Sequence, residues 1–182
     1  MDSMTLSCRY GYIKMVDMKG KRVLDRLPQI GAEDGGAVLG QLCLGFKGNQ
    51  QFESAVMISG VGHATTLNDR SAIAIFDRVW VVCGNTIFCL DLPDLTEVRR
   101  HGYADMACLG ITVFDEDLLF VYSEAISRIG KEGTEIWTVE LPDRIHGFPV
   151  IGEYFIKCHL DGGGIISLEP VSGGIVERQD GQ

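Results

Sequence analysis

The chain has 182 residues, of which 46% are hydrophobic and 23% charged, and this composition predicts one folded domain and argues against disorder. The net charge of −9 disfavours nucleic acid and anionic lipid as partners. No apolar run approaches the roughly 18 residues of a membrane-spanning helix. Residues 1–12 lack the apolar segment of a signal peptide.

Cysteines lie in apolar surroundings along the whole chain, at positions 8, 43, 83, 89, 108 and 158. None of them forms a C-x-x-C pair, and in a chain without a secretory signal buried reduced thiols are the default. We therefore expect a cytoplasmic protein without a disulfide framework. The residue pattern predicts no metal site and no cofactor.

The N-terminal residues 5–27 predict a β-hairpin. Its strands are expected at Tyr10–Asp17 and Arg22–Leu27, with a turn at Lys19-Gly20. A lone hairpin must bury its apolar face on something else. It can close a ring of sheets, or pack on another subunit, which makes a homo-oligomer through this hairpin one option.

Residues 37–68 predict a degenerate copy of the pattern that follows them. Ala37–Leu39 and Gln41–Phe46 are expected as strands, Lys47–Gln51 as a turn and Phe52–Ser59 as a further strand. The pattern of Val61–Asn68 assigns no element.

The rest of the chain contains one pattern three times, over residues 71–108, 109–146 and 147–178. Leu90, Ile129 and Leu168 are spaced by 39 residues, and Phe76 and Phe114 by 38. Each copy holds four short β-branched and aromatic runs between Gly, Asn, Asp and Pro, which predicts four strands joined by hairpins. We therefore expect an all-β fold, a small β-propeller-like array of four-stranded antiparallel blades, closed or open. An ordinary antiparallel meander is the alternative.

The last copy resembles a repeat of the PQQ-like β-propellers, and the blade layout is similar to that of WD40-like propellers. The resemblance rests on Trp137 before a strand, on Pro149-Val150 at the start of the next copy, and on the turn Leu168–Gly174. It covers one repeat well and two loosely. It implies blade-shaped sheets and does not carry over the quinone cofactor, because no matching ligand set is present.

Four large side chains recur at the inner positions of this pattern. They are expected to be buried: Phe76, Phe114, Trp137 and Ile151.

The net negative charge comes entirely from the second half of the chain. Residues 1–100 carry 11 Lys and Arg against 11 Asp and Glu, whereas residues 101–182 carry 5 against 14. Several of these carboxylates fall in expected hairpin turns, where loops carry function. They are our candidate partner-binding residues: Asp115, Glu116, Asp117, Glu132 and Glu135. The alternative is a solvated acidic surface.

His101 and His146 are candidate ligand contacts, because both fall in connectors between copies that also carry Arg and Gly. No serine lies in a G-x-S-x-G motif and no histidine pair has metal-ligand spacing. Asp161–Gly164 lacks the lysine and the spacing of a phosphate-binding loop and predicts a hairpin turn.

Three functions remain open. The favoured one is a non-enzymatic protein-binding module whose acidic surface docks a basic protein, for example an immunity or antitoxin protein. A second is a small propeller-like enzyme or ligand-binding protein with a central pocket, although the expected inner strands are mostly apolar. A third is a structural subunit of a larger β-propeller assembly.

Overall fold

The computed structural model describes residues 3–19, 26–31, 38–47, 52–62 and 67–181. The chain divides into two compact units, Met1–Ile111 and Thr112–Gln182. Within the described ranges every regular element is a β-strand, so the all-β prediction is confirmed. In these ranges no helix is long and apolar enough to cross a bilayer.

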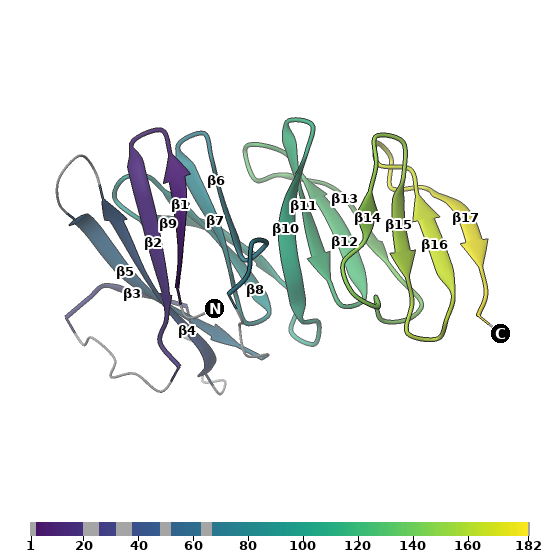
Figure 1. Ribbon diagram of the computed structural model, residues 1–182, viewed down its shortest axis with the longest axis horizontal. Helices are drawn as coiled ribbons and strands as arrows, with labels where there is room; N and C mark the ends of the chain where they lie inside the picture. Colours follow the sequence, from purple (N-terminus) through teal and green to yellow (C-terminus); the bar gives the residue numbers. More distant parts are fainter. Residues whose placement is uncertain (1–2, 20–25, 32–37, 48–51, 63–66, 182) are drawn as a thin grey trace. The chain divides into compact units, whose positions relative to one another are not determined.

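The N-terminal sheet has five strands in the order β1-β2-β4-β5-β3 (Figure 1). All neighbours are antiparallel except β3 and β5, which are parallel. The strands are β1 (Ser3–Cys8), β2 (Gly11–Asp17), β3 (Gln29–Ile30), β4 (Val38–Lys47) and β5 (Phe52–Val61). The expected strand at Phe52–Ser59 is present. The two strands expected before and after Gly40 form the single strand β4, and residues 48–51 of the expected turn lie outside the described residues.

The predicted pairing of the N-terminal hairpin is wrong. Strand β2 pairs with β1 on one side and with β4 on the other, so neither of its edges is free for Arg22–Leu27. Residues 22–25 lie outside the described part of the chain, and Arg26 and Leu27 belong to a turn and a bend. Ile13 and Met15 of β2 are fully buried in the core of the first unit, so the apolar face of this strand is already covered.

Each of the three predicted copies forms one four-stranded antiparallel sheet (Figure 1). The first contains β6 (Ala72–Ile75), β7 (Arg78–Cys83), β8 (Thr86–Asp91) and β9 (Thr96–Gly102). The second contains β10 (Cys108–Phe114), β11 (Asp117–Tyr122), β12 (Ala125–Ile129) and β13 (Glu135–Glu140). The third contains β14 (Val150–Ile151), β15 (Ile156–His159), β16 (Ile165–Leu168) and β17 (Ile175–Gln179). Within the described ranges no sheet closes on itself.

A shared irregularity shows that the three sheets are copies of one unit. In each, the register between the third and fourth strands shifts at one place, which is Cys89/Leu90, Arg128/Ile129 or Ser167/Leu168. These positions are spaced by 39 residues. Such a bulge bends the outer strand and is a conserved design feature of a sheet, not a random defect. The predicted equivalence of the strands around Ile129 and Leu168 is confirmed.

The predicted core is only partly confirmed. Phe114 is 8% exposed, but Phe76 is 57% exposed, and Trp137 and Ile151 are partly buried. The error is a shift of one residue: Phe76 opens the two-residue turn between β6 and β7, and its counterpart in the next sheet is Asp115. Both residues have a φ of 54°.

In the second unit, the turn after β16 packs on strand β13. The Trp137 Nε1 donates to the Pro170 carbonyl at 3.1 Å, and the Arg128 Nη1 donates to the same oxygen at 3.0 Å. Gly173 has a φ of +74°, and a Cβ placed there would lie 2.9 Å from the Trp137 ring. Glycine is therefore required at this contact by both its conformation and its lack of a side chain.

Candidate functional site

The five predicted carboxylates lie at one end of the sheet β10–β13. Asp115 and Glu116 form the β10–β11 turn, Asp117 begins β11, Glu132 lies in the β12–β13 turn and Glu135 begins β13. Strand direction alternates in an antiparallel sheet, so the first and third turns fall at the same end. The structure therefore brings together residues that span 115–135 in sequence, and this group is called the acidic end below.

Asp117 is engaged within the fold. Its carboxylate lies 2.7 Å from the Arg128 Nη2 and 2.8 Å from the Arg128 Nε, and the two side chains are only 17% and 12% exposed. The same guanidinium lies over the Phe114 ring, 5.1 Å from its centroid. The Asp117 charge is therefore neutralised inside the sheet. Asp115, Glu116, Glu132 and Glu135 are exposed, with Lys131 as the cation of these turns.

The neighbouring turn of the third sheet adds a carboxylate that the sequence analysis missed. Glu169 accepts backbone N–H bonds from Val171 at 2.9 Å and Ser172 at 2.6 Å. Hydrogen bonds from Ser172 and Val171, together with the charge of Arg128, lower the pKa of the Glu169 carboxyl. The signal was available, because Glu169 takes the acidic position of the turn that carried the resemblance to PQQ-like repeats.

His101 does not lie in a connector between copies, so that part of the prediction is wrong, whereas His146 does. His101 lies within strand β9 of the first unit, with its ring 6.1 Å from the Trp80 ring. His146 lies in the loop after β13 in the second unit, is 80% exposed, and has its Nδ1 3.1 Å from the Asp161 carboxylate. Their proposed ligand role stays a prediction.

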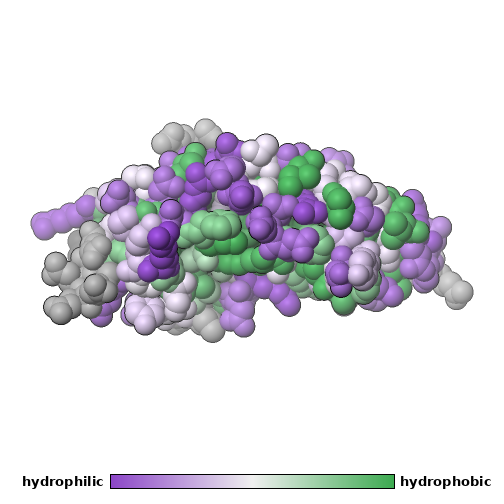
Figure 2. All heavy atoms as spheres, turned by 90° about the horizontal axis from the view of Figure 1, so that it is seen from above, coloured by the Kyte–Doolittle hydropathy of each residue, from purple (hydrophilic) through white to green (hydrophobic). Residues whose placement is uncertain are grey.

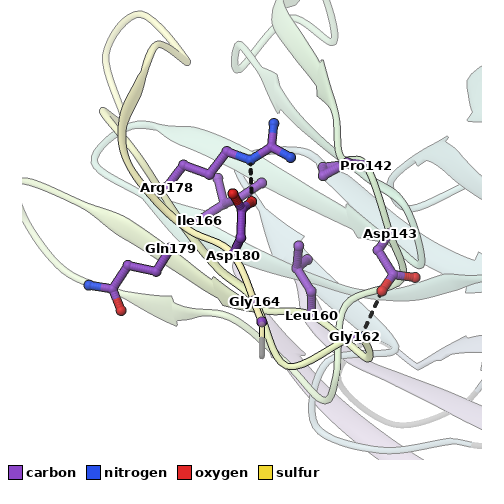
Figure 3. A pocket seen from close by; sticks show the side chains of 10 residues that line it. Pro142, Asp143, Leu160, Gly162, Gly164, Ile166, Arg178, Gln179 and Asp180 are labelled. Atoms are coloured by element: carbon purple, nitrogen blue, oxygen red, sulfur yellow. Dashed lines mark hydrogen bonds and ion pairs between the residues drawn. The ribbon is translucent and has the colours of Figure 1, made fainter.

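A shallow cavity of about 210 Å³ lies at the opposite end of the third sheet (Figure 3). Leu160 and Ile166 form its apolar wall, the Arg178–Asp180 ion pair at 3.0 Å borders it, and the Asp143 carboxylate accepts the Gly162 N–H at 2.7 Å. Gly162–Gly164 forms the β15–β16 turn, as predicted. Arg178 is thus paired with Asp180 and Asp143 with Gly162, while the Gln179 amide donates to Glu177, which does not line the cavity.

Three of the six cysteines, Cys83, Cys89 and Cys158, are buried, and the other three are partly buried; all six are free thiols. Burial raises the pKa of Cys89 and of Cys158 to about 12. The Cys83 thiol lies 3.5 Å from the Gly40 carbonyl oxygen, inside the first unit. Among the described residues no three His, Cys, Asp or Glu side chains are grouped so as to hold a metal ion.

No protein-family model matches this sequence, and no curated protein matches it. Solved structures do match its fold. The CNH domain of AfRom2 aligns over 99% of this chain and 54% of its own, with a TM-score of 0.57 and 8% identity. BamB from Moraxella catarrhalis aligns over 98% and 72%, with a TM-score of 0.52 and 14% identity. A match to the WD40 domain of Pan2 from Neurospora crassa covers 62% of this chain and 38% of that domain, with a TM-score of 0.49 and 15% identity.

These similarities confirm the fold. The chain is built from four-stranded antiparallel sheets arranged as the repeats of a β-propeller-like fold. It spans about half the length of the CNH domain that it matches. At 8% and 14% identity the likeness extends to the fold alone, and the site must be argued from this chain's own residues.

Proposed function

We propose that this chain is a non-enzymatic protein-binding module that uses the acidic end to dock a basic surface of a partner protein. One observation carries the proposal. Four exposed carboxylates from two separate turns converge at one end of a rigid sheet, while Asp117 is neutralised by Arg128. Charges of one sign on a rigid edge steer an oppositely charged partner and increase its association rate.

The kind of partner follows from size and charge. A small acidic protein that neutralises a basic toxin, as an immunity or antitoxin protein does, would need a fixed anionic surface and no catalytic group. The free thiols suit a reducing compartment, which supports a cytoplasmic location as part of this proposal. The expected partner is thus a cytoplasmic basic protein.

The test measures association rates with a basic partner recovered by affinity capture. A variant with Asp115→Lys and Glu116→Lys is compared with a variant of equal net charge, Asp105→Lys and Glu140→Lys, whose two exposed residues are not part of the acidic end. We expect the first variant to associate at least about tenfold more slowly at low salt, and the difference to shrink as salt screens exposed charges. Equal rates for the two variants would overturn the proposal.

Asp117 must be left out of this variant. The reason is its ion pair with Arg128, because a lysine at position 117 would face a largely buried guanidinium.

A second candidate function is supported by the length comparison. The chain spans 54% of the CNH domain, so it also suits a structural part of a larger β-propeller assembly. Sedimentation of the purified 182-residue chain separates the two candidates. A stable monomer favours the binding module, and a defined oligomer favours the assembly.

A further inference from the structure

The last two strands of the second sheet (β12 and β13) and of the third sheet (β16 and β17) carry residues at equivalent positions that differ in chemistry. In each sheet one residue pair comes directly before the shared bulge: Arg128 opposite Trp137 in the second, and Ser167 opposite Glu177 in the third. The register thus makes Glu177 the counterpart of Trp137, and Ser167 the counterpart of Arg128.

In the second sheet, Arg128 and Trp137 hold the turn that follows β16 by donating hydrogen bonds to it. Both the Trp137 Nε1 and the Arg128 Nη1 donate to the Pro170 carbonyl, and Gly173 of the same turn lies against the indole. Trp137 and its neighbours Thr138 and Val139 are partly buried as a result.

On β17 the same place presents the Glu177 carboxylate as an acceptor and is exposed. All five residues of β17 are exposed, and it is the edge strand of its sheet. The Glu177 carboxylate accepts one hydrogen bond from the Gln179 Nε2 at 2.6 Å and one from the Ser167 hydroxyl at 3.4 Å. A carboxylate has about four acceptor sites, so further donors can bind it. A turn that presented a backbone carbonyl to β17, as the Pro170 turn does to β13, would place that carbonyl next to the negatively charged Glu177 carboxylate.

Hydrophobic side chains flank this carboxylate. Val171, Ile175 and Val176 are 66%, 54% and 63% exposed. Figure 2 shows hydrophobic side chains standing among hydrophilic ones over the C-terminal strands. An exposed edge strand with apolar residues is a template for pairing with another extended segment.

A second copy of this chain does not suit the edge. The antiparallel register that pairs all five residues of β17 with a second β17 places Glu177 directly opposite Glu177. Like charges in directly opposed positions destabilise a strand pair. Charge complementarity therefore favours a segment of another protein that brings a cation to this position.

We propose that β17 is a docking edge for an extended segment of a partner protein that carries lysine or arginine between apolar residues. The cation binds Glu177, and the apolar residues cover Val171, Ile175 and Val176. This inference rests on the proposed function in that it assumes a basic partner, and it assigns that partner a contact away from the acidic end.

The test uses a synthetic probe, the capped hexapeptide Lys-Val-Lys-Val-Lys-Val, with Glu-Val-Glu-Val-Glu-Val as the matched control. Amide shifts of the isotopically labelled full chain are followed by NMR during titration. We expect saturable shifts at residues 175–179 with the lysine peptide only. Shifts of equal size with the glutamate peptide, or none at β17, would overturn the inference.

Two variants locate the contact. Glu177→Gln should weaken binding of the lysine peptide about twofold to fivefold, the loss expected when one exposed ion pair is removed. Glu140→Gln, which removes one exposed charge from β13, should leave it unchanged. Equal affinity of the Glu177→Gln variant and the wild type overturns the inference. Shifts confined to residues 115–117 would overturn the inference about β17 while supporting the acidic end as the binding surface. A dimer of this chain that Val176→Asp abolishes would overturn the inference in favour of pairing between two copies of β17.

Discussion

Phe76 and Asp115 occupy the same position of two successive sheets, each as the first residue of a two-residue turn with a φ of 54°. Asp tolerates the left-handed region, whereas for a bulky residue such as Phe a positive φ is an outlier. The aromatic ring of Phe76 is also 57% exposed, so little burial compensates for its conformation.

The first prediction follows from this pair. Phe76→Asn should raise the free energy of unfolding by about 0.5–1 kcal/mol, because Asn adopts positive φ at lower cost. Urea denaturation of the two proteins measures the change. A loss of stability of more than about 1 kcal/mol would show that the Phe76 ring is held in packing contacts that its exposure does not indicate.

The second prediction concerns Phe114, which is 8% exposed and lies beneath the Arg128 guanidinium. Phe114→Ala should cost about 3–5 kcal/mol, the range for emptying a buried aromatic site. Phe76→Ala is the matched control and should change stability by less than about 1 kcal/mol. Denaturation midpoints that fall equally in both variants would contradict the one-residue shift between the two turns.

The repeat could be predicted from sequence because Leu90, Ile129 and Leu168 mark one structural event, the bulge opposite the outer strand. The turn before β7 could not be placed to the residue. Matching the two aromatic residues pairs Phe76 with Phe114, whereas the turn in the structure pairs Phe76 with Asp115. Both pairings give a plausible repeat length, 38 residues from Phe76 to Phe114 and 39 from Phe76 to Asp115, so the spacing alone does not decide between them.

The N-terminal sheet was mispredicted for a different reason. Met4, Leu6 and Cys8 alternate with polar residues in β1, which is a period-two signal, but the segment is short and weakly apolar. Arg22–Leu27 has as many apolar residues and follows a Lys-Gly turn, and this turn signal favoured it as the partner of β2. For the candidate site, turn positions follow from strand alternation, whereas the Asp117–Arg128 pair depends on a diagonal side-chain contact between strands that local patterning does not encode.

The third prediction concerns this ion pair. Arg128→Ala should cost about 2–4 kcal/mol, because it leaves the largely buried Asp117 carboxylate without its donor and removes one of the two donors to the Pro170 carbonyl. Asp117→Asn should cost less, since an amide keeps a hydrogen bond to the guanidinium. A double-mutant cycle measured by urea denaturation gives the coupling energy, and a value near zero would show that the pair contributes nothing to the sheet.

The fourth prediction separates two reasons for glycine at position 173. Gly173 and Gly147 have similar φ values, +74° and +78°, but only Gly173 has the Trp137 ring in the space of a Cβ. Gly147→Ala should therefore cost about 1 kcal/mol for conformation alone, and Gly173→Ala about 2–4 kcal/mol because the clash with Trp137 is added. Only the second variant should change the Trp137 fluorescence. Equal costs would mean that the turn moves away from the indole without loss.

The last prediction uses the buried thiols. The pKa of Cys89 and of Cys158 is raised to about 12 in the folded chain by burial, whereas an unfolded thiol titrates near 8.5. Between these values the folded state binds more protons than the unfolded state, so this contribution to stability is complete below about pH 8.5 and is lost as pH rises toward 12. Urea midpoints should fall with pH over that window, and less steeply in a Cys89→Ala, Cys158→Ala variant.

In the native state at pH 8 both thiols should resist a thiol reagent, and both should react in urea. Rapid labelling of Cys158 without denaturant would show that strand β15 opens locally, because this side chain is fully buried between its neighbours in the closed sheet.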